Sequence, residues 1–279
     1  MNLISPTTIK ELLAKYQAKP SKGLGQNFLV DQNVLNKIVA VSNIQPDDII
    51  IEVGPGLGTL TKELAQKAKQ VFAVEKDETM IEVLKETLAD FKNVQVINGD
   101  ILKLDLSPYI LKGEYKVVAN IPYYLTSPLI RKFLESEKQP QEMVLMLQKE
   151  VAKRICSKPP QMSLLAVSVQ FYAKAHIEAN VSKNCFWPAP KVDSAIIKII
   201  PTENQYILPD LFFQVVKAGF VQPRKQLVNN LTTLNSPDGV KLTKEQISSW
   251  LLENKIKPSQ RSETLNISDW VNLAKSFKN

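Results

Sequence analysis

Histidine is nearly absent from this chain, which has 279 residues and a single histidine, His176. No acid or nucleophile stands at motif spacing around it, which disfavours a Ser-His-Asp hydrolase or a histidine-rich zinc site. Only two cysteines occur, Cys156 and Cys185, in unlike contexts and without other metal ligands at usable spacing. We therefore expect reduced thiols, a cytoplasmic location and no bound metal.

Long apolar runs are also missing. No run of about 18 or more apolar residues occurs, so we expect no membrane-spanning helix and no membrane partner. Residues 1–15 lack the uninterrupted apolar core of a signal peptide. What the chain does contain is 44% hydrophobic residues, enough for a large core, and a formal charge of +7. That charge favours a polyanionic partner, because each phosphate that is neutralised releases counterions.

The first two thirds of the chain alternate short apolar runs with segments of helical spacing. This alternation predicts an α/β fold with a mostly parallel sheet covered on both faces, and with the last two strands added antiparallel at its edge. The predicted strands are 49–53, 71–74, 94–97, 116–119, 143–147, 177–181 and 195–200. The predicted helices are 7–17, one capped by Asp31, 60–68, 78–91, 128–135, 149–156 and 163–172.

From about Pro209 the periodicity becomes purely helical. The predicted helices of this part are 211–220, 224–234, 244–254 and 267–277. Pro201 and Pro209 bracket a polar stretch that suits a linker. We therefore predict two domains, an α/β domain over residues 1–205 and a small all-helical domain over residues 206–279.

Asn120-Ile121-Pro122-Tyr123 follows one of the predicted strands directly. The Asn120 side-chain oxygen and the Ile121 carbonyl can accept the two N–H bonds of the exocyclic amine of a base. Pro122 stiffens the turn, and Tyr123 offers a flat face for the base ring. Taken alone, these four residues also fit a strand that ends in a proline turn with a tyrosine in the core.

A glycine-rich turn closes the first predicted strand and precedes a predicted helix. Gly54 and Gly56 permit a tight turn and a close approach of a ligand to the backbone. Glu75 ends the next strand, 21 residues after Gly54, where an acid bonds the hydroxyls of an adenosine ribose. Asp100 ends a third strand segment and can accept a hydrogen bond from an adenine amine, with the Ile101 backbone nearby.

The charge at this turn distinguishes between nucleotide cofactors. Glu52 precedes the turn, where it would repel a pyrophosphate but suit a cationic amino-acid group. Thr59 stands where a dinucleotide-binding fold commonly has its third glycine. The pattern therefore favours S-adenosylmethionine over a dinucleotide, and a methyltransferase over a dehydrogenase.

Six ordered motifs give the chain a family resemblance along essentially its whole length. The chain resembles the KsgA (RsmA) family of ribosomal RNA adenine dimethyltransferases. The matching segments are residues 25–29 (GQNFL), 52–61 (EVGPGLGTLT), 98–100 (NGD), 120–128 (NIPYYLTSP), 186–194 (FWPAPKVDS) and 220–227 (FVQPRKQL). The 222–224 segment departs from the pattern, since relatives often carry an extra basic residue there, which bears on RNA affinity.

The resemblance implies a fold, an activity and a set of site residues. The implied fold is Rossmann-like, with a mostly parallel seven-stranded sheet and a small C-terminal helical domain. The implied activity is the transfer of four methyl groups from S-adenosylmethionine to N6 of two adjacent adenosines, in a hairpin loop near the 3′ end of 16S rRNA. The implied cofactor contacts are Asn27, Leu29, Gly54, Gly56, Glu75, Asp100, Ile101 and Asn120, and Tyr123 and Phe186 match the aromatic positions expected to hold the flipped adenine.

RNA capture is expected from basic residues near both ends of the chain, Lys19, Lys22, Arg224 and Lys225. The expected partner is 16S rRNA within an immature small ribosomal subunit, bound by a monomer. Two other functions stay open at this point. One is a large-subunit (23S) rRNA dimethyltransferase that confers macrolide resistance, which the 25–26 and 220–231 segments disfavour. The other is a mainly non-catalytic RNA-binding assembly factor.

Overall fold

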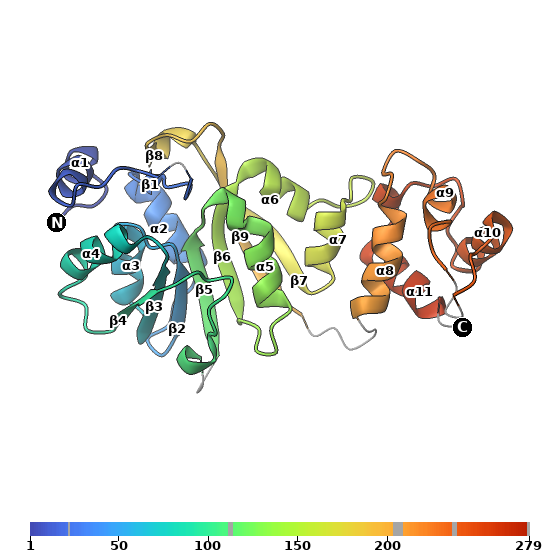
Figure 1. The fold of residues 1–279 in the computed structure, drawn as a ribbon, viewed down its shortest axis with the longest axis horizontal. Helices are drawn as coiled ribbons and strands as arrows, with labels where there is room; N and C mark the ends of the chain where they lie inside the picture. Colours follow the sequence, from blue (N-terminus) through green and yellow to red (C-terminus); the bar gives the residue numbers. More distant parts are fainter. Residues whose placement is uncertain (22, 111–113, 203–208, 236–238, 278–279) are drawn as a thin grey trace. The chain divides into compact units, whose positions relative to one another are not determined.

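The structure is a computed structural model that describes residues 1–21, 23–110, 114–202, 209–235 and 239–277 (Figure 1). It divides the chain into two units. The first unit comprises Met1–Ala152 and Ala175–Pro201, and the second comprises Lys153–Lys174 and Thr202–Asn279.

A seven-stranded sheet forms the centre of the first unit. The strands, in spatial order, are β4 (Val94–Asn98), β3 (Gln70–Glu75), β2 (Ile49–Val53), β5 (Tyr115–Asn120), β6 (Glu142–Gln148), β9 (Ser194–Pro201) and β7 (Ala173–Val181). Strand β2 pairs in parallel with β3 and β5, and the pairs β3–β4 and β5–β6 are parallel too. Strand β9 runs antiparallel to β6. The predicted α/β fold with a mostly parallel sheet is confirmed.

The central strands are buried because helices cover both faces of this sheet (Figure 1). Ile50 and Ile51, neighbours on β2 that point to opposite faces, are both fully buried. Val117 and Val118 repeat this on β5. A strand covered on both faces buries residues at nearly every position, which is why these strands read as apolar runs, interrupted by the charged residues Glu52 and Lys116.

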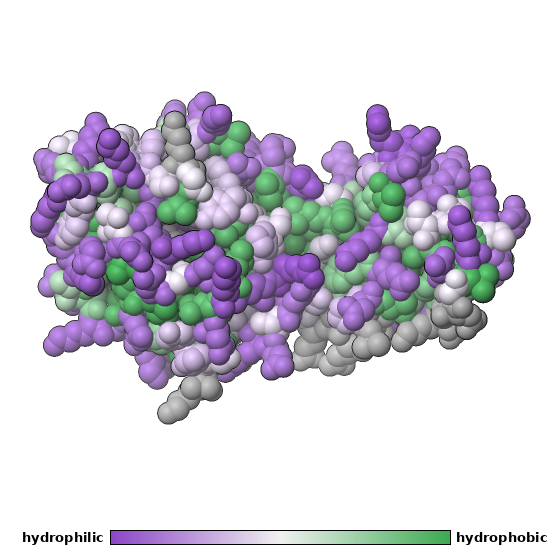
Figure 2. Space-filling model, viewed as in Figure 1, coloured by the Kyte–Doolittle hydropathy of each residue, from purple (hydrophilic) through white to green (hydrophobic). Residues whose placement is uncertain are grey.

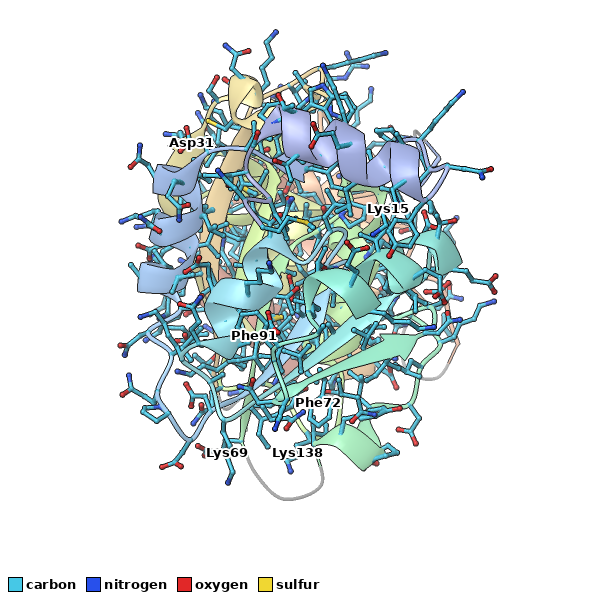
Figure 3. All side chains as sticks on the ribbon, turned by 90° about the vertical axis from the view of Figure 1, so that its left-hand side faces the viewer. Lys15, Asp31, Lys69, Phe72, Phe91 and Lys138 are labelled. Atoms are coloured by element: carbon cyan, nitrogen blue, oxygen red, sulfur yellow. The ribbon has the colours of Figure 1, made fainter. Side chains whose placement is uncertain are left out.

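The helices of the first unit differ at their starts, since Ser5, Asp31 and Asp77 cap helices with their side chains, whereas Gly58 and Leu125 provide no side-chain cap. The helices are α1 (Pro6–Lys15), α2 (Gln32–Val41), α3 (Thr59–Ala65), α4 (Glu78–Thr87), α5 (Thr126–Leu134) and α6 (Lys149–Ile155), the last of which ends in the second unit. Asp31 caps α2 as predicted, and its side chain accepts a hydrogen bond from the Val34 backbone N–H. Lys15 of α1 lies beside α4 (Figure 3), and its Nζ donates to Glu86 at 2.7 Å.

A two-stranded antiparallel ribbon was not predicted. It joins β1 (Phe28–Leu29) to β8 (Phe186–Trp187), with Leu29 opposite Phe186 and Phe28 opposite Trp187. The ribbon ties the N-terminal loop to the segment that leads into β9. Short 3₁₀ turns complete the unit at η1 (Ser107–Tyr109), η2 (Tyr123–Leu125) and η3 (Lys183–Cys185).

The second unit is helical and has its own core. Its helices are α7 (Leu164–Gln170), α8 (Pro209–Gly219), α9 (Leu227–Leu231), α10 (Lys244–Glu253) and α11 (Ile267–Ser276), with the 3₁₀ turn η4 (Ser262–Thr264). Trp270 of α11 is fully buried, and its ring lies so close to Gly219 that a Cβ at that position would be 2.4 Å from a ring carbon. Glycine at the end of α8 thus allows α8 and α11 to pack closely.

The division of the chain into units differs from the single predicted boundary at residue 205, a position outside the described residues. The difference concerns residues 153–174. This segment belongs to the second unit. Phe171 stacks on Phe212 of α8 with ring centroids 3.9 Å apart, and Ala166 and Val167 share the same buried cluster. The helical periodicity of residues 149–156 and 163–172 gave no sign that these apolar side chains pack with helices much later in the chain.

Among the described residues, no helix is long and apolar enough to cross a bilayer. The face drawn in Figure 2 is mostly hydrophilic, with smaller apolar areas between the polar side chains. The described ranges also contain no group of three or more His, Cys, Asp or Glu side chains placed to hold a metal ion.

Candidate active site

One pocket of the first unit gathers residues from the carboxyl ends of four neighbouring parallel strands. In open α/β sheets, ligands bind outside these strand ends, where the connecting loops leave a crevice. The pocket is lined by all twelve residues predicted for the cofactor and the base: Asn27, Leu29, Gly54, Gly56, Glu75, Asp100, Ile101, Asn120, Ile121, Pro122, Tyr123 and Phe186.

The glycine turn after β2 leaves its backbone open to a ligand. Gly54 and Gly56 adopt φ angles of +67° and +57°, which residues with a Cβ rarely tolerate. A Cβ on Gly56 would stand 3.4 Å from the Phe28 ring, and one on Gly54 would stand 3.5 Å from Cδ of Pro122. The turn therefore packs against both the N-terminal loop and the Asn120–Tyr123 segment.

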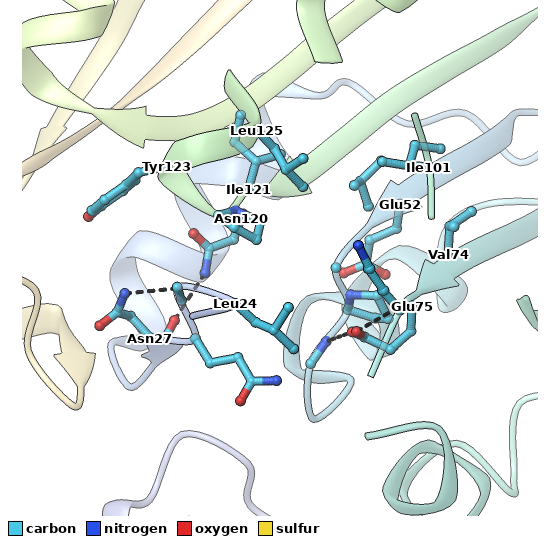
Figure 4. A pocket seen from close by; sticks show the side chains of 18 of the residues that line it. Leu24, Asn27, Glu52, Val74, Glu75, Ile101, Asn120, Ile121, Tyr123 and Leu125 are labelled. Carbon is cyan, nitrogen blue, oxygen red and sulfur yellow. Dashed lines mark hydrogen bonds between the residues drawn. The ribbon is translucent and has the colours of Figure 1, made fainter. Parts of the chain in front are cut away.

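Glu75 is held in place at the end of β3 by backbone donors. Its carboxylate accepts a hydrogen bond from Gly56 N at 3.3 Å (Figure 4). It also accepts from Lys76 N at 2.8 Å and from Asp77 N at 2.9 Å. Burial raises the pKa of Glu75, and the three backbone donors oppose that rise. Because a carboxylate has about four acceptor positions, Glu75 can also accept from ribose hydroxyls.

Glu52 is the most unusual side chain of the pocket. It is 1% exposed, and its Oε2 has no hydrogen-bond partner among the described residues. Burial raises the pKa of Glu52 to about 8, and the nearby charge of Glu75 adds to the rise. An isolated buried carboxylate is costly unless a cation joins it, so this site is built for a positively charged group.

Asp100 is held by a lysine at the mouth of the pocket. Its Oδ2 accepts from Lys76 Nζ at 3.0 Å, and its Oδ1 accepts from the Leu102 backbone at 3.0 Å. The Lys76 hydrogen bond and the Leu102 N–H lower the pKa of Asp100. Asp100 is therefore a carboxylate acceptor at neutral pH, which suits an adenine amine.

Asn120 and Asn27 connect the Asn120–Tyr123 segment to the N-terminal loop. Asn120 Nδ2 donates to the Asn27 carbonyl at 3.4 Å, and Asn27 Nδ2 donates to the Gly25 carbonyl at 3.0 Å (Figure 4). With its amino group used in this way, Asn120 keeps its Oδ1 as a hydrogen-bond acceptor. The Ile121 N–H donates to the Met146 carbonyl at 3.2 Å, which fixes the peptide between Asn120 and Ile121.

Tyr123 and Phe186 provide the two aromatic side chains predicted for the base. The Tyr123 hydroxyl bonds the Ser194 hydroxyl at 2.8 Å, and Ser194 is fully buried at the start of β9. Burial raises the pKa of Tyr123, so the phenol stays protonated at neutral pH. Phe186 is 5% exposed and stands opposite Leu29 in the β1–β8 ribbon.

The charged groups that line the pocket fit S-adenosylmethionine. Among the lining residues that the structure describes, three acids, Glu52, Glu75 and Asp100, face a single lysine, Lys76. This surplus of negative charge suits a ligand that carries an ammonium and a sulfonium, and the carboxylates of Glu75 and Asp100 suit a ribose and an adenine. The open glycine turn leaves space between these two ends.

The basic residues predicted for RNA capture lie in both units. Lys19 is exposed in the first unit, and Lys22 lies outside the described residues. Arg224 and Lys225 are exposed in the second unit, in the turn that precedes α9. Lys225 also lines a smaller pocket there, together with Gln222 and Asn229.

Several pocket residues were missed from the sequence. Lys76 and Tyr124 both line the pocket, and so does Gln26, whose Nε2 donates to Asp77 at 2.8 Å. The sequence did offer a signal for Lys76 and Tyr124, because they directly follow the predicted site residues Glu75 and Tyr123. Asp77, the partner of Gln26, could not be recognised from the sequence, because it reads as an ordinary helix cap of α4.

Comparison with known proteins gives consistent family matches. The family model described as ribosomal RNA adenine dimethylase matches residues 17–274. A relative from Geobacillus kaustophilus, named ribosomal RNA small subunit methyltransferase A, is 42% identical over 286 residues, which cover 99% of this chain and 97% of the relative. A relative of the same name from Dehalococcoides mccartyi is 43% identical over 274 residues, which cover 96% of this chain and 92% of the relative.

Two solved structures share the fold. A dimethyladenosine transferase from Plasmodium falciparum aligns with a TM-score of 0.76 and 30% identity, covering 89% of this chain and 96% of its own. The 23S rRNA methyltransferase ErmE aligns with a TM-score of 0.72, covering 91% of this chain and 100% of its own. At 24% identity, the second likeness concerns the fold alone.

Proposed function

Because the chain belongs to the ribosomal RNA adenine dimethylase family, we propose that it methylates N6 of two adjacent adenosines in the 3′-terminal hairpin loop of 16S rRNA, transferring four methyl groups. It is an S-adenosylmethionine-dependent rRNA adenine dimethyltransferase. The observation that carries the proposed chemistry is the position of Asn120–Tyr123, which lines the same pocket as Glu52, Glu75 and Asp100. An amine acceptor and a cationic methyl donor thereby meet in one cavity.

The cofactor residues divide the pocket by charge. Glu52 and the Gly54–Gly56 turn hold the amino-acid end, Glu75 the ribose, and Asp100 with the Ile101 backbone the adenine. When bound, S-adenosylmethionine supplies a methyl group on a sulfonium, whose sulfur leaves as a neutral thioether. The chain's own acids bind the cation and orient it toward Asn120.

The acceptor residues must make a poor nucleophile reactive. The N6 lone pair of adenine is delocalised into the ring, so it attacks well only when the amine turns toward tetrahedral geometry. Asn120 Oδ1 and the Ile121 carbonyl accept the two N–H bonds and aim the lone pair at the methyl group. The flipped base lies against Tyr123 and Phe186, and stacking of about 1–3 kcal/mol per base offsets much of the unstacking cost.

No general base is needed for this transfer. The N6 proton becomes acidic as the nitrogen takes on positive charge, so water can accept it. Tyr123 keeps its own proton at neutral pH because burial raises its pKa, which makes it a stacking surface and not a base. This chemistry requires position more than acid–base groups, in agreement with a chain that has one histidine.

The substrate proposal follows the relatives. Those that are 42–43% identical are named small subunit methyltransferases, whereas the 23S enzyme ErmE shares the fold at 24% identity. These identities favour the small subunit over the alternative of a 23S enzyme. Within this proposal the chain acts in the cytoplasm as a monomer, on 16S rRNA of an immature small subunit.

Asn120→Ala tests the function and the acceptor site together. We expect kcat for methyl transfer onto small subunits from an unmethylated strain to fall on the order of 100-fold, because the amine loses an oriented acceptor. Asn36→Ala, an exposed change on α2, is the matched control and should leave kcat unchanged. Near-normal kcat in Asn120→Ala contradicts the acceptor role, and products mapped only to 23S rRNA contradict the substrate.

A further inference from the structure

Tyr124 is an exposed aromatic side chain at the pocket that the proposed chemistry leaves unused. It is 53% exposed, although it lines the same pocket as Tyr123 and follows it on the turn η2. Within the described part of the chain, its hydroxyl makes no hydrogen bond and its ring contacts no other aromatic ring. Tyr123, by contrast, is anchored through Ser194.

Tyr124 has glycine backbone beside its ring and a lysine in the same pocket. A Cβ on Gly25 would stand 3.9 Å from the ring carbon Cδ1, so backbone without a side chain lies against this ring. Lys76 lines the same pocket, where its Nζ donates to Asp100 Oδ2 at 3.0 Å. The Lys76 side chain is 57% exposed. An exposed ring with a nearby lysine is the pair of groups that binds one nucleotide of single-stranded RNA.

We propose that Tyr124 and Lys76 form a second nucleotide subsite, where the base next to the flipped adenosine stacks on Tyr124 and its phosphate contacts Lys76. This inference rests on the proposed function, in which the substrate presents two adjacent adenosines. Only one of the two adenosines fits against Asn120 at a time, so the neighbouring base must bind outside the acceptor position. Tyr124 adjoins Tyr123 in the chain, and adjacent bases can therefore reach both rings.

The subsite also accounts for how one enzyme serves both adenosines. A dimethylated adenine cannot donate to Asn120, but it keeps its π-face and can still stack on Tyr124. The two adenosines can thus exchange places after the first is complete. Tyr124 is then a substrate-positioning residue that touches the neighbouring base and not the reacting nitrogen.

A double-mutant cycle between protein and RNA tests this subsite. The readout is the single-turnover methylation rate of one adenosine in the hairpin, with the neighbouring adenosine either intact or replaced by an abasic nucleotide. For the wild type, we expect removal of the neighbouring base to slow methylation about tenfold, the effect of one lost stacking contact. Tyr124→Ala should be about tenfold slower on intact RNA and should lose little more on abasic RNA, because the two changes remove the same contact.

Three further variants sharpen the result. Tyr124→Phe keeps the ring and should restore the wild-type rate and its sensitivity to the abasic change. Ile177→Ala, another exposed apolar change in the first unit, should behave as the wild type. Lys76→Met should lower the salt dependence of RNA binding by about one phosphate contact, whereas Tyr124→Ala should leave it unchanged.

The outcomes separate this proposal from the proposed function. A wild type that methylates the hairpin but ignores the abasic change overturns the subsite alone. The same holds if Tyr124→Ala keeps the full tenfold sensitivity. A wild type that methylates no adenosine of small-subunit RNA overturns the proposed function itself. Cofactor affinity, measured by calorimetry, should change less than twofold in Tyr124→Ala, and a larger loss would assign Tyr124 to the cofactor site instead.

Discussion

At the scale of single residues, Glu52 connects cofactor binding to pH. Its carboxyl is buried without a hydrogen bond on Oε2 and has a pKa of about 8. In the free enzyme near pH 7 it is therefore largely protonated. A cationic group brought beside it favours the ionised form, so cofactor binding should release this proton.

Glu52→Gln tests that linkage. In the wild type, we expect cofactor affinity to rise with pH up to about 8, and calorimetry in buffers of different ionisation enthalpy should detect proton release. Glu52→Gln should bind more weakly at pH 8 and lose this pH dependence, because its amide cannot ionise. Asp90→Asn, at an exposed acid outside the pocket lining, is the control. An unchanged pH profile in Glu52→Gln would remove Glu52 from cofactor binding.

The same group affects folding stability in the opposite direction. Because the folded-state pKa of Glu52 lies above its usual 4.5, the folded state holds a proton that the unfolded chain has lost. The stability that comes with this proton is complete below about pH 4.5 and is lost as pH rises through about 8. Cofactor-free Glu52→Gln should therefore lose less stability than the wild type between pH 6 and 9, as thermal unfolding would measure.

At the scale of elements, the sequence predicts what is locally encoded. Strand β2 was predicted with its observed bounds, because Ile49–Val53 is apolar except for Glu52 and is followed by a glycine turn. Helix α9 is shorter than predicted and begins at Leu227, since the Leu227 N–H donates to the Gln260 carbonyl at 2.7 Å, outside the helix. That partner is distant in sequence, and no periodicity could indicate it.

The site residues that the sequence predicted are likewise those with a local signal. Gly54, Glu75, Asp100 and Asn120 were placed from the sequence because each comes at or just after the end of a parallel strand, and such ends meet at one edge of the sheet. The β1–β8 ribbon was missed because two-residue strands carry no periodicity. The Lys76–Asp100 ion pair was missed because it depends on side-chain direction after two different strands.

The contact between α8 and α11 gives a prediction for one glycine. Gly219→Ala would place a Cβ 2.4 Å from the buried Trp270 ring, and the overpacking should cost about 1–3 kcal/mol of unfolding free energy. Denaturant titration measures this. Gly23→Ala is the matched control, since its Cβ would meet only the Ser21 hydroxyl at 3.9 Å. Equal stability of the two variants would mean that α8 and α11 can separate without cost.

At the scale of the whole molecule, positive charge is divided between two units. Lys19 belongs to the first unit, and Arg224 and Lys225 belong to the second. The second unit also recruits residues 153–174 from the middle of the chain. The chain therefore crosses between its units three times, so neither unit corresponds to a single continuous stretch of sequence.

The charged candidates should affect RNA affinity through salt. Replacing Lys19, Arg224 or Lys225 with Gln should each weaken RNA binding and reduce the slope of log K against log salt by about 0.7–0.9, because one phosphate contact is lost. Filter binding at several salt concentrations gives these slopes. Lys85→Gln, an exposed lysine paired with Glu82 on α4, should leave the slope unchanged. A candidate that behaves like Lys85 is ordinary surface charge.

The β1–β8 ribbon sets a condition on when the enzyme becomes competent during its synthesis. Phe28 and Leu29 leave the ribosome early, but their partners, Phe186 and Trp187, follow only after most of the first unit has emerged. Until then, the N-terminal loop has no strand to pair with, and the pocket lacks Phe186 as a wall. A nascent chain that already holds its glycine turn and acids is thus still unable to enclose a base, so methylation waits for the chain to pass this point.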